Sequence, residues 1–102
     1  MYTIDDLLGL IVAERAEHLL LRAGMAPVLI LKSQEHTIEG PPLDVDNANA
    51  ILSEVAGTRR VREIRVRGVS EFVFRFRKTT DFLVQAMFDG DNVHLDFKRI
   101  PA

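Results

Sequence analysis

The strongest constraint on the fold is a regular alternation of apolar and other residues along three runs in the last third of the chain. The apolar members are Phe72, Phe74 and Phe76, then Phe82, Val84, Ala86 and Phe88, and finally Val93, Leu95 and Phe97. Successive side chains of a strand point to opposite faces of a sheet, so each run predicts a strand with one buried face. The polar residues 77–80 and the Asp-Gly pair within residues 89–92 predict the turns that join the three strands into antiparallel hairpins.

The first segment carries the signals of a helix that begins at Ile4. Thr3 and Asp6 have the spacing of a capping box, and Asp5 and Asp6 suit the positive end of a helix dipole. Apolar residues then recur at helical spacing, at Ile4, Leu7, Leu8, Ile11 and Val12. We expect a helix over residues 4–16 with this stripe facing a core.

Two short apolar runs follow, over residues 17–22 and 28–32, with Gly24 and Pro27 between them. They predict two strands in a hairpin. A polar turn at residues 33–35 and a third, short strand at 36–38 come next. The prolines at 41 and 42 then break the chain.

Residues 44–67 predict one or two helices. Asp44 is a suitable N-cap, Gly57 fits a left-handed C-terminal cap, and the apolar face between them comprises Val45, Ala48, Leu52 and Val55. The segment 58–67 is compatible with a helix or a strand, because Val61 and Ile64 have helical spacing while Ile64 and Val66 alternate. We favour a short helix capped by Thr58.

The element order is therefore helix, three strands, one or two helices, and three strands. This order predicts a single α+β domain over residues 1–102, a mostly antiparallel sheet of about six strands with helices on one face. The absence of cysteine excludes disulfides and thiol chemistry, and no apolar run approaches the ~20 residues that cross a bilayer. With no recognisable signal peptide, we expect a cytoplasmic protein without membrane insertion.

No motif for catalysis is found. The glycines form neither a P-loop nor a G-x-G-x-x-G loop, and the serines lie in no G-x-S-x-G elbow. The three histidines fall on different predicted elements, and Asp89 and Asp91 are turn residues rather than the start of a calcium loop. We therefore expect no enzymatic activity, no metal and no cofactor.

Charge is distributed unevenly along the chain. Residues 59–78 contain eight basic and two acidic residues, a balance of +6. Because the whole chain has a net charge of −2, the other residues together carry −8. The basic members are Arg59, Arg60, Arg62, Arg65, Arg67, Arg75, Arg77 and Lys78. They are candidates for a protein-docking surface, or for a solvated face with pairs such as Arg59 and Glu63. Nearby phenylalanines could stack on bases, but we expect core phenylalanines and no nucleic acid partner, because the acidic remainder would repel phosphates.

Several segments resemble one protein family. They are residues 24–27 (GMAP), the turn 41–43 (PPL), the strand 70–74 (SEFVF), the run 82–86 and the closing residues 99–101 (RIP). Together they resemble the N-terminal domain of the PilT-like pilus retraction ATPases, which are kin to the type II secretion ATPases. The resemblance implies a PAS-like fold with the element order given above. It also implies a domain that accompanies a P-loop ATPase domain in a hexameric ring and packs against a neighbouring subunit.

The chain departs from the family pattern at three places. Residues 16–21 read AEHLLL where the family has roughly ASDLHL, and residues 30–33 read ILKS in place of an R-x-D-G turn. Residues 81–85 read DFLVQ where the family has RFRVN, whose arginines face the nucleotide region. Both arginines are absent, which suggests that the fold is kept while a contribution to ATP hydrolysis is lost.

Our leading hypothesis is a non-catalytic protein-binding adaptor or regulatory domain that docks on a pilus or secretion ATPase through the basic residues 59–78. One alternative is the N-terminal part of a longer pilus retraction ATPase. Another is a PAS-like sensor that encloses a small ligand between sheet and helices. Because the ring-forming ATPase domain is not in this sequence, we expect a monomer or weak dimer, with one short edge strand and one whose charges discourage pairing.

Overall fold

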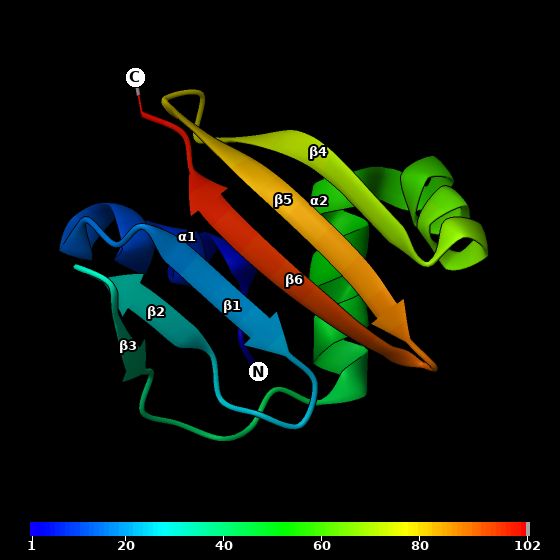
Figure 1. The fold of residues 1–102 in the computed structure, drawn as a ribbon, viewed down its shortest axis with the longest axis horizontal. Coiled ribbons are helices and arrows are strands. Elements are labelled where there is room, and N and C mark those ends of the chain that lie inside the picture. Colours follow the sequence, from blue (N-terminus) through cyan, green and yellow to red (C-terminus); the bar gives the residue numbers. More distant parts are fainter. Residues whose placement is uncertain (102) are drawn as a thin grey trace.

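The computed structural model describes residues 1–101, which form a six-stranded antiparallel sheet with two helices behind one of its faces (Figure 1). The elements in chain order are α1 (Ile4–Glu14), β1 (His18–Arg22), β2 (Val28–Leu31), β3 (Gln34–Thr37), α2 (Val45–Arg67), β4 (Val69–Phe76), β5 (Thr80–Asp89) and β6 (Asn92–Arg99). The predicted α+β class and element order are confirmed.

The sheet consists of two three-stranded meanders joined side by side. Its strand order is β3-β2-β1-β6-β5-β4, so the first strand of the chain pairs with the last. β1 and β6 are antiparallel, with Cα partners running from His18↔Lys98 to Arg22↔His94. Both helices cover the same face, which leaves the opposite face without a helix; we call it the open face (Figure 1).

Helix α1 begins as predicted and ends two residues early. The Thr3 hydroxyl accepts a hydrogen bond from the Asp6 backbone N–H at 3.2 Å, as an N-cap does. The helix stops at Glu14 because Arg15 adopts a left-handed conformation (φ 57°, ψ 36°) and its N–H bonds back to the last turn. Val12, which we placed on the buried stripe, is 36% exposed.

Helix α2 consists of the two predicted helical segments, joined by a kink. The Asp44 carboxylate accepts from the Asn47 N–H at 2.7 Å, which confirms the N-cap. Gly57 ends the first segment as predicted, with a positive φ of 79°, but its ψ of 159° is that of a kink and not of a left-handed cap. A second helical segment then continues to Arg67, so the helix over residues 58–67 is correct. The left-handed cap is Gly68 (φ 85°), whose N–H donates to the Ile64 carbonyl at 2.7 Å.

The third strand begins two residues and ends one residue before its predicted bounds. Lys32 and Ser33 both have positive φ, 52° and 64°, and they form a tight turn that starts β3 at Gln34 rather than at residue 36. A two-residue turn with positive φ at both positions matches the twist of its flanking strands. Residues 34 and 35, expected in the turn, are thus in the strand, and Ile38 lies beyond it.

The alternation in the last third of the chain is confirmed by burial. Phe82, Val84, Ala86, Val93, Leu95 and Phe97 are all buried against the helices. Phe82 contacts Phe76 and Phe97 edge to face, with ring centroids 6.3 and 6.5 Å apart. The only buried polar residue in the described part is Asn47, while Val45, predicted on the buried face of its helix, is 38% exposed.

Candidate protein-binding surface

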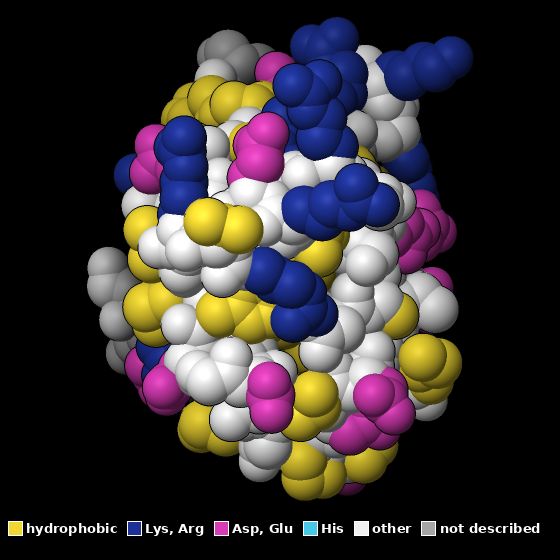
Figure 2. Space-filling view, turned by 90° about the vertical axis from the view of Figure 1, so that its right-hand side faces the viewer, with side chains coloured by type: hydrophobic (Ala, Val, Ile, Leu, Met, Phe, Trp, Pro, Cys, Tyr) yellow, Lys and Arg dark blue, Asp and Glu magenta, His cyan; other side chains and the backbone are white. Residues whose placement is uncertain are grey.

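The eight basic residues singled out from the sequence are all exposed, but the structure divides them between two regions. Five arginines lie on the second half of α2, and Arg75, Arg77 and Lys78 lie at the end of β4 and in the turn after it. Figure 2 shows Lys and Arg side chains gathered over the upper part of one face, with hydrophobic side chains exposed between them. The segment is therefore not one uniform surface.

Arg75 and Arg77 are occupied by ion pairs within the chain. Arg75 Nε lies 2.9 Å from Asp81 Oδ1, across the β4–β5 pair. Hydrogen bonding to Asp81 raises the pKa of Arg75 above its ordinary value. Arg75 and Arg77 each lie 2.9 Å from a carboxylate oxygen, which neutralises their charge locally.

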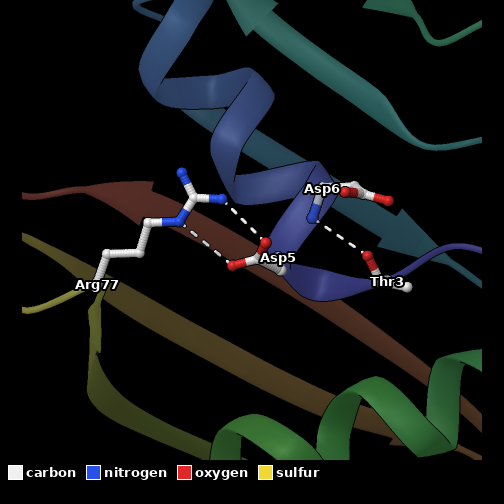
Figure 3. Close-up of polar contacts among 4 residues, drawn as sticks. All are labelled: Thr3, Asp5, Asp6 and Arg77. Atoms are coloured by element: carbon white, nitrogen blue, oxygen red, sulfur yellow. Dashed lines mark hydrogen bonds and ion pairs between the residues drawn. The ribbon is translucent and has the colours of Figure 1, made fainter.

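The Arg77 pair links the β4–β5 turn to the first turn of α1 (Figure 3). Arg77 Nη2 donates to Asp5 Oδ2 at 2.9 Å, and its Nε donates to Oδ1 at 3.3 Å. The hydrogen bond to Asp5 raises the pKa of Arg77. Asp5 stands beside Asp6, whose N–H is capped by Thr3, so the helix cap and the ion pair share one turn.

Two arginines of α2 hold the helix against the sheet. The guanidinium carbon of Arg60 lies 4.6 Å from the ring centre of Phe72, and that of Arg65 lies 4.7 Å from the ring centre of Phe88. Arg65 also donates to Asn49 Oδ1 at 3.2 Å. These cation–π contacts give both side chains a role in packing.

The remaining cations of α2 point into solvent. Arg59 reaches Glu63 only at 3.8 Å, with an exposed side chain. Within residues 1–101, Arg62 and Arg67 have no ion pair, hydrogen bond or aromatic contact. Val66 is 88% exposed and lies one turn from Arg62, on the same side of the helix. We call Arg59, Arg62, Val66 and Arg67 the α2 patch.

A second candidate lies on the open face, in a depression of about 630 Å³. Its lining includes Leu20, Arg22, Met87, His94 and Asp96. Asp96 Oδ1 is 3.0 Å from Nδ1 of His18, and the buried Nδ1 of His94 has no hydrogen-bond partner among residues 1–101. The sequence did not predict this site, because its residues come from four strands and are ordinary polar and apolar members of each alternation. It lies on the face opposite to the one where we expected a ligand.

Residues 1–101 contain neither a cluster of metal ligands nor a membrane-spanning helix. No group of three His, Asp or Glu side chains could hold a metal ion there. No helix of this part is both long and apolar enough to cross a membrane.

Comparison with known proteins identifies the fold. No family model matches the sequence, and no curated protein matches it. A crystal structure of the pilus retraction motor PilT with bound ADP matches with a TM-score of 0.88 and 17% identity, over 100% of this chain and 30% of that chain.

Two ATPases called DotB are also similar. The DotB of Legionella pneumophila matches with a TM-score of 0.84 and 13% identity over 97% of this chain, and that of Yersinia pseudotuberculosis with 0.79 and 14% over 95%. The chain spans less than a third of the length of each, 28% and 29% for the DotB proteins. The resemblance found in the sequence is thus confirmed in the structure: this chain has the fold of a part of the PilT and DotB ATPases.

Proposed function

We propose that this chain is a non-catalytic, protein-binding domain that docks on an ATPase of the pilus retraction or secretion class. The kind of partner is suggested by the fold, since the similar solved structures are the PilT motor and the DotB ATPases. In this proposal, ATP hydrolysis belongs to a P-loop domain outside the matched part of those proteins. The absence of the two family arginines at residues 81 and 83 agrees with a domain that does not assist hydrolysis.

The observation that carries the proposal is the α2 patch. Two of its arginines have no partner within the described residues, and they flank a valine that is 88% exposed. Arginine is enriched at protein interfaces, and an apolar residue beside it gains from removal of water. The patch therefore suits an acidic surface with an apolar contact at its centre.

The test is a binding titration of a purified PilT-type ATPase, comparing two charge-reversal variants. Arg62→Glu with Arg67→Glu removes the free cations of the α2 patch. Arg65 is left intact, because it packs on Phe88. The matched control is Arg22→Glu with Lys98→Glu. It changes the net charge by the same amount, but at two residues of the open face.

We expect the α2 variant to bind at least about tenfold more weakly, and added salt to weaken the unmodified chain. The control should bind like the unmodified chain. Equal binding by all three proteins would contradict docking through α2, and a loss in the control alone would transfer the interface to the open face.

A second candidate is that the chain is a domain of a longer ATPase. It is favoured by a match that covers the whole of this chain but 30% of the PilT chain. Reading the coding sequence beyond residue 102 decides the question: a downstream Walker motif establishes this candidate, and a stop codon excludes it.

The third candidate is a small-ligand sensor, which the depression on the open face supports. A thermal-shift screen of nucleotides and metabolites tests it, because a ligand at 100 times its Kd adds about 2.7 kcal/mol of stability. No shift across the screen would count against it.

A further inference from the structure

The edge strand β4 leaves one side of its backbone unpaired. It has eight residues, stands last in the strand order and has β5 as its one neighbouring strand. The opposite edge strand, β3, has four residues. In Figure 1, β4 forms the upper border of the sheet. An edge of this length is a template for pairing unless its side chains prevent it.

The bonds to β5 show which β4 residues have outward backbone groups. The Phe88 N–H donates to the Gly68 carbonyl at 2.8 Å, and the register then continues from Val69↔Met87 to Phe76↔Thr80. Bonded residues alternate in an antiparallel pair, so the even-numbered residues of β4 bond to β5. The odd-numbered residues of β4 therefore direct N–H and C=O away from the sheet.

The same odd-numbered residues carry a self-complementary pattern of side chains: Val69, Glu71, Val73 and Arg75. If a second β4 approaches antiparallel with the two-fold axis at Val73, each Glu71 lies opposite Arg75 of the second copy. The two Val73 residues lie opposite each other. We propose that this chain forms a two-fold symmetric dimer by β4–β4 pairing centred on Val73.

Neighbouring registers do not offer this complementarity. Centring on residue 71 or 75 places like charges directly opposite each other, which destabilises a sheet. Centring on residue 72 places Glu71 opposite Val73. Centring on residue 74 places Arg75 opposite Val73, and its one opposite-charge pair, Glu71 with Arg77, would need an arginine that lies beyond the strand and already pairs with Asp5. We expected charges on an edge strand to discourage pairing. In β4, Glu71 and Arg75 instead favour the single register centred on Val73.

The pairing also covers apolar surface and extends existing polar contacts. Val73 is 56% exposed, and the half-buried Phe74 would lie opposite Phe72 of the second copy. Arg75 already contacts Asp81, and Glu71 accepts from Gln85 Nε2 at 2.8 Å. Across the new pair, Asp81 and Arg75 of one copy and Glu71 of the other would alternate in charge, and Gln85 would end the row as a hydrogen-bond donor. In this register Val69 of each copy lies opposite residue 77 of the other, where β4 has already ended.

Single cysteines provide the test, because the chain contains none. In Val73→Cys, the two cysteines of the dimer face each other across a bonded pair with Cα atoms about 5.5 Å apart, within the range of a disulfide. The matched control is Val69→Cys, on the same strand and face, where the valine is 57% exposed. In the proposed register the two control cysteines are offset by eight residues, about 27 Å.

We expect Val73→Cys, and not Val69→Cys, to form a covalent dimer on mild oxidation or with a short bis-maleimide at millimolar protein. Equal crosslinking of both variants, crosslinking of the control alone, or crosslinking of neither would overturn the proposal. Amide hydrogen exchange of the unmodified chain is the second measurement. The amides of Glu71, Val73 and Arg75 should gain protection as concentration rises, whereas unchanged exchange at millimolar concentration would also overturn it.

Discussion

Asn47 is the residue for which the structure makes the sharpest stability prediction. It is 3% exposed, and its amide bridges both backbone groups of Tyr2. Oδ1 accepts from the Tyr2 N–H and Nδ2 donates to the Tyr2 carbonyl, both at 2.7 Å. The contact ties Tyr2, which precedes the N-cap of α1, to the first turn of α2, 45 positions along the chain. We predict that Asn47→Ala destabilises the fold more than its small change in volume suggests.

The magnitude follows from the two bonds. Each intramolecular hydrogen bond contributes about 0.5–1.5 kcal/mol net, and a buried group left unpaired costs about 1–3 kcal/mol. Alanine is the better helix former by roughly 0.6 kcal/mol, which offsets part of the loss. We expect the free energy of unfolding to fall by about 2 kcal/mol, and the melting temperature to fall by about 10 °C for a domain of this size.

Urea unfolding and thermal melting followed by circular dichroism measure this loss. The control is Asn49→Ala, two residues along the same helix, which has the same gain in helix propensity but loses hydrogen bonds that are exposed. The control should change the free energy of unfolding by less than about 0.5 kcal/mol, as surface substitutions usually do. If both variants unfolded at the same urea concentration, the assigned role of the Asn47 bridge would be refuted.

Three further predictions can be checked by the same unfolding measurements. Gly57→Ala should lower the free energy of unfolding by about 1–3 kcal/mol, because a φ of 79° strains any side chain. Gly9 lies in a regular helix with its nearest neighbour atom at 3.6 Å, so Gly9→Ala should raise the free energy of unfolding by up to about 1 kcal/mol. A rise for both variants would disprove the strain at Gly57. Phe82→Ala removes a fully buried ring and should cost about 3–5 kcal/mol, and a loss under about 1 kcal/mol would contradict its place in the core. Tyr2→Phe removes the exposed hydrogen bond from the hydroxyl to the Pro41 carbonyl at 2.6 Å and should cost less than about 1 kcal/mol, so a larger loss would show that this hydroxyl anchors the loop.

The sequence predicted those parts of the fold in which burial follows a simple period. The hairpins of the last third and the caps at Thr3 and Asp44 are local signals, and the structure confirms them. The turn predicted at residues 33–35 lies at Lys32 and Ser33, and its position was misjudged because both residues have positive φ without glycine or asparagine. Gly57 was correctly placed at the end of the first helical segment, but a glycine marks a positive φ without showing whether a cap or a kink forms there.

The sequence identified the basic residues of the candidate surface, but it did not show which of them are free and which are paired or packed. The basic residues are exposed as expected, yet the pairing of Arg77 with Asp5 joins positions 72 apart, a distance over which periodicity gives no information. The division between packed and free arginines depends on which rings lie beneath them. Asn47 was missed for a related reason, since its partners are backbone groups and carry no residue signature.

The pairing of β1 with β6 determines when this sheet can form. The two strands lie at opposite ends of the chain, so their ladder closes a loop of some seventy residues before it gains a hydrogen bond. Contacts so distant along a chain slow folding, and strands that wait for partners are prone to aggregate. During synthesis the first meander therefore has an exposed edge until β6 has left the ribosome. Strand β1 is the first strand to be synthesised but gains its second neighbour, β6, only at the end of synthesis. The chain should depend most on chaperones between these two events.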